Sequence, residues 1–194
     1  MQNGIIAAAY NTGMVKKVLV IIAREGFQDH ELAGVRNALK AAGFLIIIGS
    51  TRAGPCTGKF GSVENAETAI KDAIINDYDR TVFIGGPGAL SLAERGDAKA
   101  LAVETLAAGK ILGAICIAPV ILARAGVLNG RRATVWDSDG EQAALLKASG
   151  AIYTGEAVTV DGKIVTGNGP MAAEVFGKTF AELRIDTTSR LKRS

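Results

Sequence analysis

Four short apolar runs, each followed by a stretch with helical periodicity, constrain the fold of this chain more than any other feature. The runs lie at residues 18–23, 45–49, 81–84 and 111–115, and apolar and polar residues hardly alternate within them. Strands of this kind are covered on both faces, as in a parallel sheet between two helical layers. The sequence therefore predicts a doubly wound α/β sandwich with three layers, in which ligands bind at the carboxyl ends of the strands.

The stretches between the runs supply the predicted helices. Within residues 29–42, Leu32, Val35 and Leu39 recur at the spacing of one helix face, and Gly43 provides a stop signal. Similar amphipathic stretches predict helices at residues 66–75, 97–108, 119–125, 140–148 and 170–183. None of the connecting stretches has the composition of a linker, so we expect a single α/β domain.

Two hairpin signals interrupt this rhythm. Asp161-Gly162 lies between two short β-branched runs and predicts a hairpin with a type I′ turn. The Gly-rich residues 54–61 predict a second, small excursion from the sandwich. Cys56 lies in this excursion, where we expect an incidental surface thiol; a secondary peroxide-sensitive site is the alternative.

The positive charge of the protein belongs to one end of the chain. The formal net charge is +3, and residues 184–194 alone carry four basic residues against one aspartate. We therefore expect these residues to form a solvated basic tail, while the neutral body binds no nucleic acid. The domain itself is predicted to span residues 16–183, with residues 1–15 as an N-terminal extension.

The N-terminal residues include an apolar run, residues 4–10, that is too short for the core of a signal peptide. No Lys or Arg precedes Lys16, so the positive region of a signal peptide is also missing. No segment approaches the roughly 18 apolar residues that a membrane span needs. We expect a cytoplasmic protein that does not bind membranes.

The chain has only two cysteines, Cys56 and Cys116, and a single histidine, His30. Two cysteines cannot form a disulfide framework, and the three residues lack the clustered spacing of a zinc site. We therefore expect no metal centre. Any mechanism that needs two imidazoles within one chain is excluded.

Residues 113–119 join a predicted strand to a predicted helix and place Cys116 on the turn between them. The residues two positions to either side, Ala114 and Ala118, are small, as the strained turn of a nucleophile elbow requires. We expect the N–H groups and the dipole of the following helix to favour the thiolate and to lower the pKa of Cys116. The alternative is an ordinary buried cysteine, because free cysteines are among the most buried residues.

Two other segments follow the carboxyl ends of predicted strands. Glu31 lies in the first helical turn after the first strand, where its carboxylate could meet Cys116; the alternative is that it only complements the helix dipole. Gly85 and Gly86 follow the strand at residues 81–84, and glycines there let backbone N–H groups approach an oxyanion. We expect the N–H groups of Gly86 and Ile117 to form an oxyanion hole.

Two glycine-rich segments resemble nucleotide-binding motifs only in part. Residues 167–172 match G-x-G-x-x-A, but no second strand and no ribose-binding carboxylate follow them. Gly58-Lys59 lacks the Ser or Thr that follows the lysine of a P-loop. The sequence therefore predicts no cofactor.

Several motifs, in their order along the chain, together resemble the ThiJ/PfpI superfamily. They are Phe27-Gln-Asp-His-Glu31-Leu, the Gly85-Gly86 turn, Ala114-Ile-Cys116-Ile-Ala-Pro119, Gly126-Val-Leu-Asn-Gly-Arg131, Val160-Asp-Gly-Lys-Ile-Val and Thr166-Gly-Asn-Gly169-Pro170. This superfamily includes the Parkinson-disease protein deglycase and the PfpI proteins, and it has the class I glutamine amidotransferase-like fold. The resemblance implies a flavodoxin-like sandwich, a reactive Cys116 hydrogen-bonded to the carboxylate of Glu31, and a homodimer or larger homo-oligomer.

Five positions depart from the pattern of the superfamily. Ile117 stands where the peptidase-like members have a histidine, and Leu90 falls near the place of an acid that they contribute across a subunit interface. Trp136 stands where the deglycase branch has a histidine, Asn168 replaces an arginine, and Gln28 replaces an upstream carboxylate. The resemblance therefore identifies the family, and these departures leave more than one reaction open.

The remaining site predictions concern the walls of the pocket. We expect Gly85, Trp136, Asn168 and Pro170 to line it, with a core position as the alternative for Trp136. His30 directly precedes Glu31 and lies about 100° from it around the predicted helix, so it should point away from Cys116. It could contribute to a site only from a second subunit.

The leading hypothesis is a cysteine-dependent enzyme that hydrates or hydrolyses reactive carbonyls, of the glyoxalase III or deglycase type. It would act on a small electrophile or on a modified protein: Cys116 attacks the carbonyl and Glu31 carries the proton. The alternative is a redox-responsive protein that protects against oxidative stress, whose Cys116 oxidises to a sulfinate without turnover. An intracellular peptidase is less well supported, because the histidine and the interface acid are missing.

Overall fold

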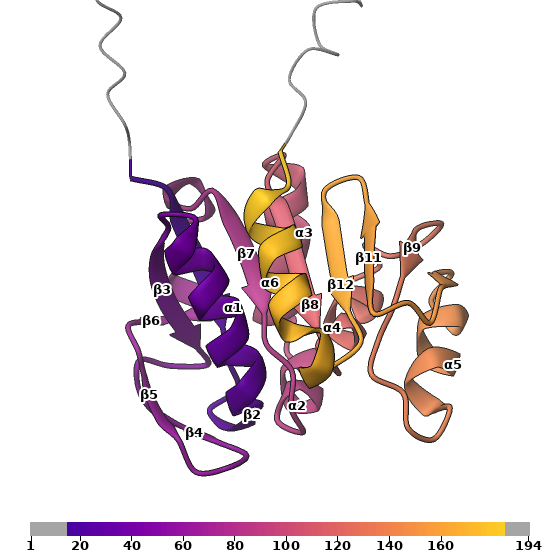
Figure 1. The fold of residues 1–194 in the computed structure, drawn as a ribbon, viewed down its shortest axis with the longest axis horizontal. Coiled ribbons are helices and arrows are strands. Elements are labelled where there is room, and N and C mark those ends of the chain that lie inside the picture. Colours follow the sequence, from indigo (N-terminus) through magenta and orange to yellow (C-terminus); the bar gives the residue numbers. More distant parts are fainter. Residues whose placement is uncertain (1–14, 185–194) are drawn as a thin grey trace, which may run out of the picture.

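The central element of the protein is a seven-stranded sheet with the strand order β11-β12-β8-β7-β1-β3-β6 (Figure 1). The computed structural model describes residues 15–184, so most of the predicted N-terminal extension and basic tail lies outside the described residues. The strands are β1 (Lys17–Ile21), β3 (Leu45–Ser50), β6 (Thr68–Ala69), β7 (Arg80–Phe83), β8 (Ile111–Ile115), β11 (Val158–Asp161) and β12 (Ile164–Gly167). All neighbouring strands are parallel except β11 and β12.

Two helical layers cover the sheet, as predicted. Helices α1 (Asp29–Ala41) and α6 (Ala173–Glu182) pack against each other on one face, while α2 (Ala89–Glu94), α3 (Gly96–Ala107) and α4 (Pro119–Arg124) lie on the other (Figure 1). Helix α5 (Glu141–Ala148) packs beside α4. The doubly wound, mostly parallel α/β sandwich is therefore confirmed.

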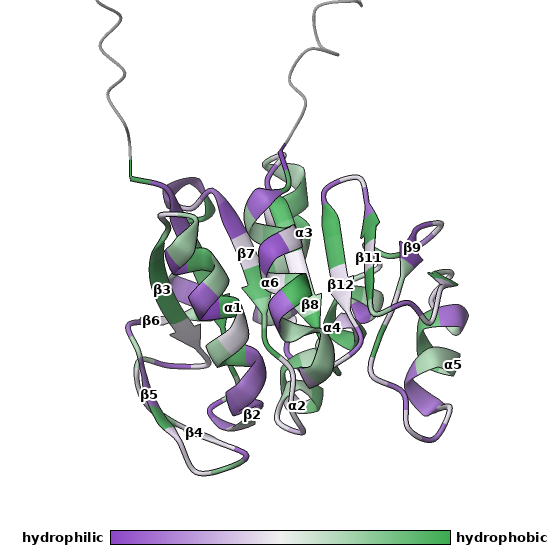
Figure 2. Ribbon diagram, viewed as in Figure 1, coloured by the Kyte–Doolittle hydropathy of each residue, from purple (hydrophilic) through white to green (hydrophobic). Residues whose placement is uncertain are grey.

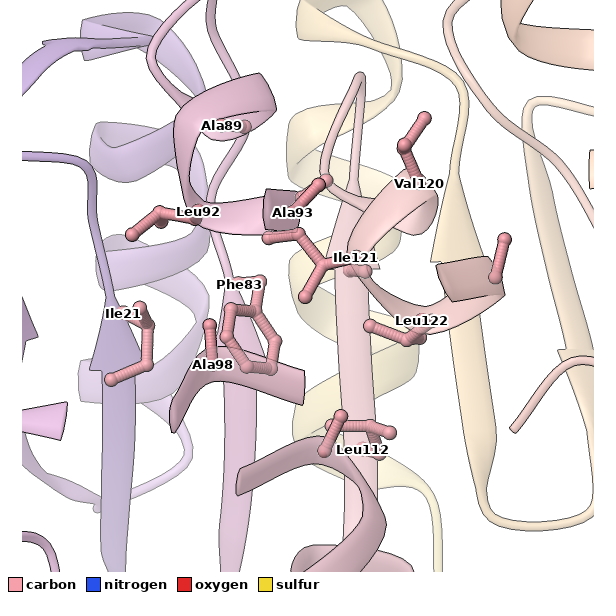
Figure 3. Packing of buried hydrophobic residues seen from close by; sticks show 14 of the residues in the cluster. Ile21, Phe83, Ala89, Leu92, Ala93, Ala98, Leu112, Val120, Ile121 and Leu122 are labelled. Atoms are coloured by element: carbon pink, nitrogen blue, oxygen red, sulfur yellow. The ribbon is translucent and has the colours of Figure 1, made fainter. Parts of the chain in front are cut away.

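The apolar runs lack alternation because each strand supplies both cores. In β1, Leu19 and Ile21 belong to the core under α2, α3 and α4, whereas Val18 and Val20 belong to the core under α1 and α6. Figure 2 shows the strands of the central sheet coloured mostly as hydrophobic. Figure 3 shows the first core, where the ring of Phe83 lies among side chains from the neighbouring strands and helices.

Four predicted helices, at residues 97–108, 119–125, 140–148 and 170–183, are confirmed with small shifts at their ends. The last begins with a short 3-10 turn, η3 (Pro170–Ala172), before α6. No pattern in the sequence predicted α2, which has six residues and no side-chain cap at its start. Its buried face, Ala89, Leu92 and Ala93, is too short for a recognisable helical period.

The prediction of a helix at residues 66–75 is wrong. This segment contains the end of β5 (Val63–Ala66), then β6, and two short 3-10 turns, η1 (Ile70–Asp72) and η2 (Ile75–Asp77). Thr68 and Ala69 pair with the edge of β3, so backbone pairing in the sheet replaces the local helical preference. Tertiary contacts of this kind cannot be read from the periodicity of one segment.

The predicted excursion at residues 54–61 is present and forms a small sheet with β5. Strands β2 (Glu25–Phe27), β4 (Gly54–Gly58) and β5 make up this sheet, in the order β2-β4-β5. Cys56 is completely buried within β4 and faces the core under α1. The expectation of a surface thiol is therefore wrong, because the inward face of β4 alternates with its exposed face and Cys56 lies on the inward one.

The predicted hairpin of β11 and β12 is confirmed, but its turn type is not. Asp161 pairs with Ile164, so Gly162 and Lys163 form the turn. Of these two residues only Gly162 has a positive φ, 58°, whereas a type I′ turn needs a positive φ at both. Beside β11, β9 (Arg132–Ala133) and β10 (Ile152–Tyr153) form a separate two-stranded ribbon.

Among residues 15–184, no helix is long and apolar enough to cross a membrane.

A buried arginine joins the amino-terminal edge of the sheet to the end of α6. The Arg80 guanidinium donates hydrogen bonds to the carbonyl groups of Phe180 and Leu183. It also lies over the rings of Phe44 and Phe180, at 4.6 and 5.5 Å from the ring centroids. Burial lowers the pKa of Arg80 to about 10, yet the two carbonyls and the two rings give the cation a favourable environment.

We predict that Arg80→Met lowers the free energy of unfolding by about 2–3 kcal/mol, because both carbonyls at the helix end lose their donor and the ring contacts lose their cation. Arg95→Met is the matched control: Arg95 pairs with Asp97 at the surface and should contribute less than about 1 kcal/mol. Urea denaturation of both variants measures the difference. Equal losses in the two variants would contradict the role assigned to Arg80.

Candidate active site

Cys116 lies directly after β8 on a backbone turn in the left-handed region. Its φ is 63°, and no other non-glycine residue in the described part of the chain has a positive φ. This conformation costs about 1–2 kcal/mol for a residue with a side chain. Two hydrogen bonds hold it: the N–H of Cys116 donates to the Gly167 carbonyl at 2.8 Å, and the Cys116 carbonyl accepts from the N–H of Trp136 at 2.8 Å.

The turn at Cys116 has the surroundings that a nucleophile elbow requires. Ala114 and Ala118 are fully buried, and Cys116 itself is only 5% exposed. Gly85, at the end of β7, comes so close that a Cβ atom there would lie 2.5 Å from the Cβ of Cys116 and 2.8 Å from Oε2 of Glu31. Glycine is therefore needed at position 85 for steric reasons.

Glu31 is the third residue of α1 and is completely buried. Helix α1 begins at Asp29 because Gln28 caps it. The side-chain oxygen of Gln28 accepts a hydrogen bond from the N–H of His30 at 3.2 Å. The N–H of Gly85 donates to Oε2 of Glu31 at 3.1 Å. Oε1 receives no N–H or O–H from the described residues, so an ionised carboxylate would keep one buried oxygen without a donor.

The surroundings of Glu31 favour its protonated form. Burial raises the pKa of Glu31 to about 7, although the hydrogen bonds with Cys116 and Gly85 and the charge of Lys59 act in the opposite direction. A carboxyl group with this pKa can give and take a proton near neutral pH.

The expectation that the pKa of Cys116 is lowered is wrong for the thiol beside an ionised Glu31. Burial and the negative charge of Glu31 raise the pKa of Cys116 to about 12, and the N–H groups of Gly86 and Ile117 compensate only in part. Helix α4 has six residues and begins at Pro119, so its dipole is too short to favour a thiolate strongly. The thiol and the carboxyl group therefore titrate as a coupled pair.

The two N–H groups expected to form an oxyanion hole both face the sulfur of Cys116. Gly86 has a φ of 98°, and a Cβ atom there would lie 2.6 Å from the backbone nitrogen of Gln28. Only glycine can therefore bring the N–H at position 86 to this place. Whether these groups also bind an oxyanion stays a prediction.

The three other residues predicted to line the pocket lie on the side of Cys116 that faces β12. Trp136 is 41% exposed and rests on Gly169, so it is not a core residue. Asn168 and Pro170 are half-buried and flank that glycine, and the N–H of Asn168 donates to the Ala157 carbonyl at 3.0 Å.

His30 does not join this group. It is exposed, and its ring lies 5.2 Å from the ring of Phe60, between centroids. Its expected direction, away from the site, agrees with this position; a role in a second subunit stays a prediction. The described residues also contain no group of three His, Cys, Asp or Glu side chains that could hold a metal ion.

Comparison with known proteins shows to which family the chain is related. The family model described as DJ-1/PfpI matches residues 16–183.

The chain belongs to the DJ-1/PfpI family.

The resemblance seen in the sequence motifs is thereby confirmed. A protein named as a deglycase from Thermococcus kodakarensis is 31% identical over 169 residues, which cover 86% of this chain and 98% of that protein. An uncharacterized protein from Methanocaldococcus jannaschii is 37% identical over 162 residues, which cover 83% of this chain and 78% of that protein.

Solved structures agree with this membership of the DJ-1/PfpI family. The ThiJ/PfpI domain protein from Brachyspira murdochii has a TM-score of 0.83 at 28% identity, covering 87% of this chain and 96% of that one. DJ-1beta from Drosophila melanogaster has a TM-score of 0.77 at 25% identity, covering 87% of this chain and 90% of that one.

Sequence reasoning missed Lys59, whose charge acts on Glu31 from a distant part of the chain. Lys59 follows β4, and its N–H donates to the Phe27 carbonyl at 2.8 Å. The carboxylate of Asp29 holds the same loop, since it accepts hydrogen bonds from the N–H groups of Phe60 and Ser62 at 3.0 and 3.1 Å. The glycine-rich composition of this excursion predicted a loop, but no local signal shows that it folds back onto the start of α1.

We predict that Gly85→Ala disrupts the site and destabilises the protein by about 3 kcal/mol, because the new methyl group would overlap the side chains of Cys116 and Glu31. Gly96→Ala is the control, since nothing lies within 4 Å of a Cβ atom at that position. It should be neutral or slightly stabilising. Thermal unfolding measures both effects, and a Gly85→Ala variant as stable as the wild type would show that the site tolerates the added group.

We also predict a pH-dependent difference in stability between the wild type and Glu31→Gln. The pKa of Glu31 rises from its ordinary 4.5 to about 7 on folding, so the wild type loses stability relative to the variant as pH rises from 4.5 through 7. The loss should total about 3 kcal/mol. Urea denaturation at about pH 4.5 and about pH 8 measures it.

Glu174→Gln serves as the control for this measurement, because Glu174 is exposed and pairs only with Lys178 at the surface. Its stability relative to the wild type should change little over the same pH range. A difference of the same small size for Glu31→Gln would mean that Glu31 keeps an ordinary pKa in the folded protein.

Proposed function

We propose that this DJ-1/PfpI protein is a cytoplasmic, cysteine-dependent enzyme that hydrates 2-oxoaldehydes to 2-hydroxy acids, with carbonyl adducts on proteins as related substrates. The observation that carries the proposal is the buried carboxyl group of Glu31, which lies with Cys116 around Gly85 and whose pKa burial raises to about 7. Relatives named as deglycases, at about 30% identity, support carbonyl chemistry.

The reactive form of the pair places the proton on Glu31 and the negative charge on sulfur. A protonated Glu31 no longer repels the thiolate, and a proton on Oε1 removes the need for a donor there and can be donated to the sulfur. The N–H groups of Gly86 and Ile117 also stabilise the thiolate. Near neutral pH the pair can therefore hold one proton and still present a nucleophile.

The first step forms a bond between the Cys116 sulfur and the aldehyde carbon. The electron pair of the carbonyl moves to its oxygen, which the N–H groups of Gly86 and Ile117 would bind, and Glu31 gives that oxygen its proton. The product is a hemithioacetal, and Glu31 is left ionised.

The next steps need no external oxidant. The Glu31 carboxylate removes the proton from the former aldehyde carbon, which gives an enediol bound to sulfur. Glu31 then returns this proton to the neighbouring carbon, and the hydroxyl proton of the former aldehyde carbon passes to the neighbouring oxygen, so the former carbon becomes a thioester and the latter an alcohol. Water then attacks the thioester, the carbon–sulfur bond breaks, and the 2-hydroxy acid leaves. One carbon is oxidised and the other reduced, and the net change is the addition of one water molecule.

The same surroundings argue against peptide hydrolysis. Among the described residues, Glu31 is the only ionisable group that affects the pKa of Cys116. Ile117 and Leu90 occupy the places where a histidine and an acid would help an amine to leave, and His30 is directed elsewhere. Addition to a carbonyl needs a single proton carrier, which the site has.

We further propose that the protein forms a homodimer or a larger homo-oligomer. Phe60 and Val63, on the loop and strand beside the site, are 61% and 69% exposed. Apolar side chains gathered at one edge of a small sheet are typical of a surface that pairs with another chain.

We predict that the wild type consumes methylglyoxal and releases lactate, and that Cys116→Ser and Glu31→Gln each reduce the rate by about 100-fold or more, because they remove the nucleophile and the proton carrier. Cys56→Ala is the matched control, since Cys56 is a buried cysteine of β4 that affects the pKa of neither Glu31 nor Cys116. It should keep the wild-type rate.

The redox alternative gives a different result in the same experiments. No lactate at high enzyme concentration, together with a sulfinate at Cys116 after mild peroxide, would overturn the enzymatic proposal in favour of a redox-responsive protein. Equal turnover in the wild type and Cys116→Ser would overturn the assignment of the nucleophile.

A further inference from the structure

The indole of Trp136 is a feature of the site that the proposed reaction does not use. Trp136 is the only tryptophan in the chain, and 41% of it is exposed. Tryptophan side chains are highly buried on average, because their large apolar surface is costly to leave in water. An exposed indole one backbone hydrogen bond away from the nucleophile therefore needs an explanation.

The position of Trp136 is fixed before any ligand arrives. Its N–H donates to the Cys116 carbonyl at 2.8 Å, and the two residues before it, Thr134 and Val135, are buried. The indole rests on Gly169, where an added Cβ atom would lie 2.6 Å from Cε3 and 3.2 Å from Cζ3. A rigid aromatic group that is already in place binds a flat partner at a low entropic cost.

The residues that follow Gly169 in the chain, beside the indole's resting place, are uncharged. Pro170 and Met171 follow Gly169, and Met171 is 96% exposed. The next residue along the chain from the indole, Asp137, is occupied elsewhere: its carboxylate accepts hydrogen bonds from the N–H groups of Gly140 and Ala143 at the start of α5. This wall of the site thus favours an uncharged flat group over a small or ionic one.

We propose that Trp136 is a specificity-determining residue that stacks on a planar apolar substituent of the substrate, so that the preferred substrates are 2-oxoaldehydes with an aromatic ring. This inference rests on the proposed function for its reaction, but the binding it describes does not require turnover. An arylglyoxal would take up one water molecule and leave as an aryl 2-hydroxy acid, by the same steps as above. Stacking on the indole should favour an aryl substituent over a methyl group by about tenfold.

Two neutral hydroxyketones, which lack the reactive aldehyde of the substrates, test the binding without turnover. 2-Hydroxyacetophenone and hydroxyacetone carry the same polar groups and differ only in phenyl against methyl. In the Cys116→Ser variant, fluorescence of the single tryptophan reports binding directly. We expect 2-hydroxyacetophenone to change this fluorescence at about tenfold lower concentration than hydroxyacetone.

A second readout extends the test to variants without the tryptophan. Each ketone should slow the alkylation of Cys116 by iodoacetamide, and the aryl ketone should do so at about tenfold lower concentration. Trp136→Ala should abolish this preference, and Trp136→Phe should retain much of it because an aromatic face remains. Since Trp136 is exposed, neither variant leaves a buried cavity that would prevent folding.

The inference is overturned if both ketones bind equally in the wild type, if Trp136→Ala keeps the aryl preference, or if ligands leave the tryptophan fluorescence unchanged. Fluorescence that depends only on protein concentration would assign Trp136 to a contact between subunits and would also overturn it. Failure of the proposed function looks different: no turnover of methylglyoxal or phenylglyoxal, with the aryl preference in binding intact.

Discussion

The left-handed backbone turn at Cys116 is the constraint on which the rest of the site depends. A residue with a side chain pays about 1–2 kcal/mol for this conformation, and here two hydrogen bonds, to Gly167 and from Trp136, hold it in place. The side chain of Cys116 then lies at the carboxyl edge of the sheet. The chain that follows β7 must have glycine there, because a Cβ atom would overlap Cys116. Gly85 satisfies that demand and gives its N–H to Glu31. The turn at one residue thus requires the glycine beside it and ties the backbone of Trp136 to the site.

The energetics of the pair follow from burial. A carboxyl group that is 0% exposed and has only one backbone donor is most stable when protonated, and burial accordingly raises the pKa of Glu31 to about 7. A thiol beside an ionised carboxylate is harder to deprotonate, which raises the pKa of Cys116 to about 12. The two values belong together, since each group sets the charge that the other meets. A site with a single proton between two atoms suits addition to carbonyls better than cleavage of amides.

Patterns that depend on neighbours in the sequence allowed a large part of this structure to be predicted. The apolar runs predicted the central strands, and the small residues around Cys116 predicted the turn. Predictions failed where distant segments decide the outcome. Residues 66–75 pair with the edge of β3 instead of forming a helix, and Cys56 is buried because β4 packs against the sandwich.

The electrostatics of the site were harder still to predict. The helix after Cys116 suggested a lowered thiol pKa, but the opposite shift requires knowing that Glu31 is buried beside the sulfur. The influence of Lys59 on Glu31 likewise depends on a loop that folds back from another part of the chain. Periodicity and turn signals describe the backbone, whereas a pKa depends on every group that the fold brings within a few ångströms.

The pH dependence of alkylation at Cys116 tests the central claim most directly, namely that the pair can react near neutral pH through a form with the proton on Glu31 and the charge on sulfur. The reaction with iodoacetamide is best followed in Cys56→Ala, in which Cys116 is the only cysteine. The account predicts a rate that rises with a midpoint near 7, the pKa at which the pair loses its first proton. A rate that rises only at or above 9.0, the ordinary pKa of a thiol, would show that no such form reacts near neutral pH and would contradict the account.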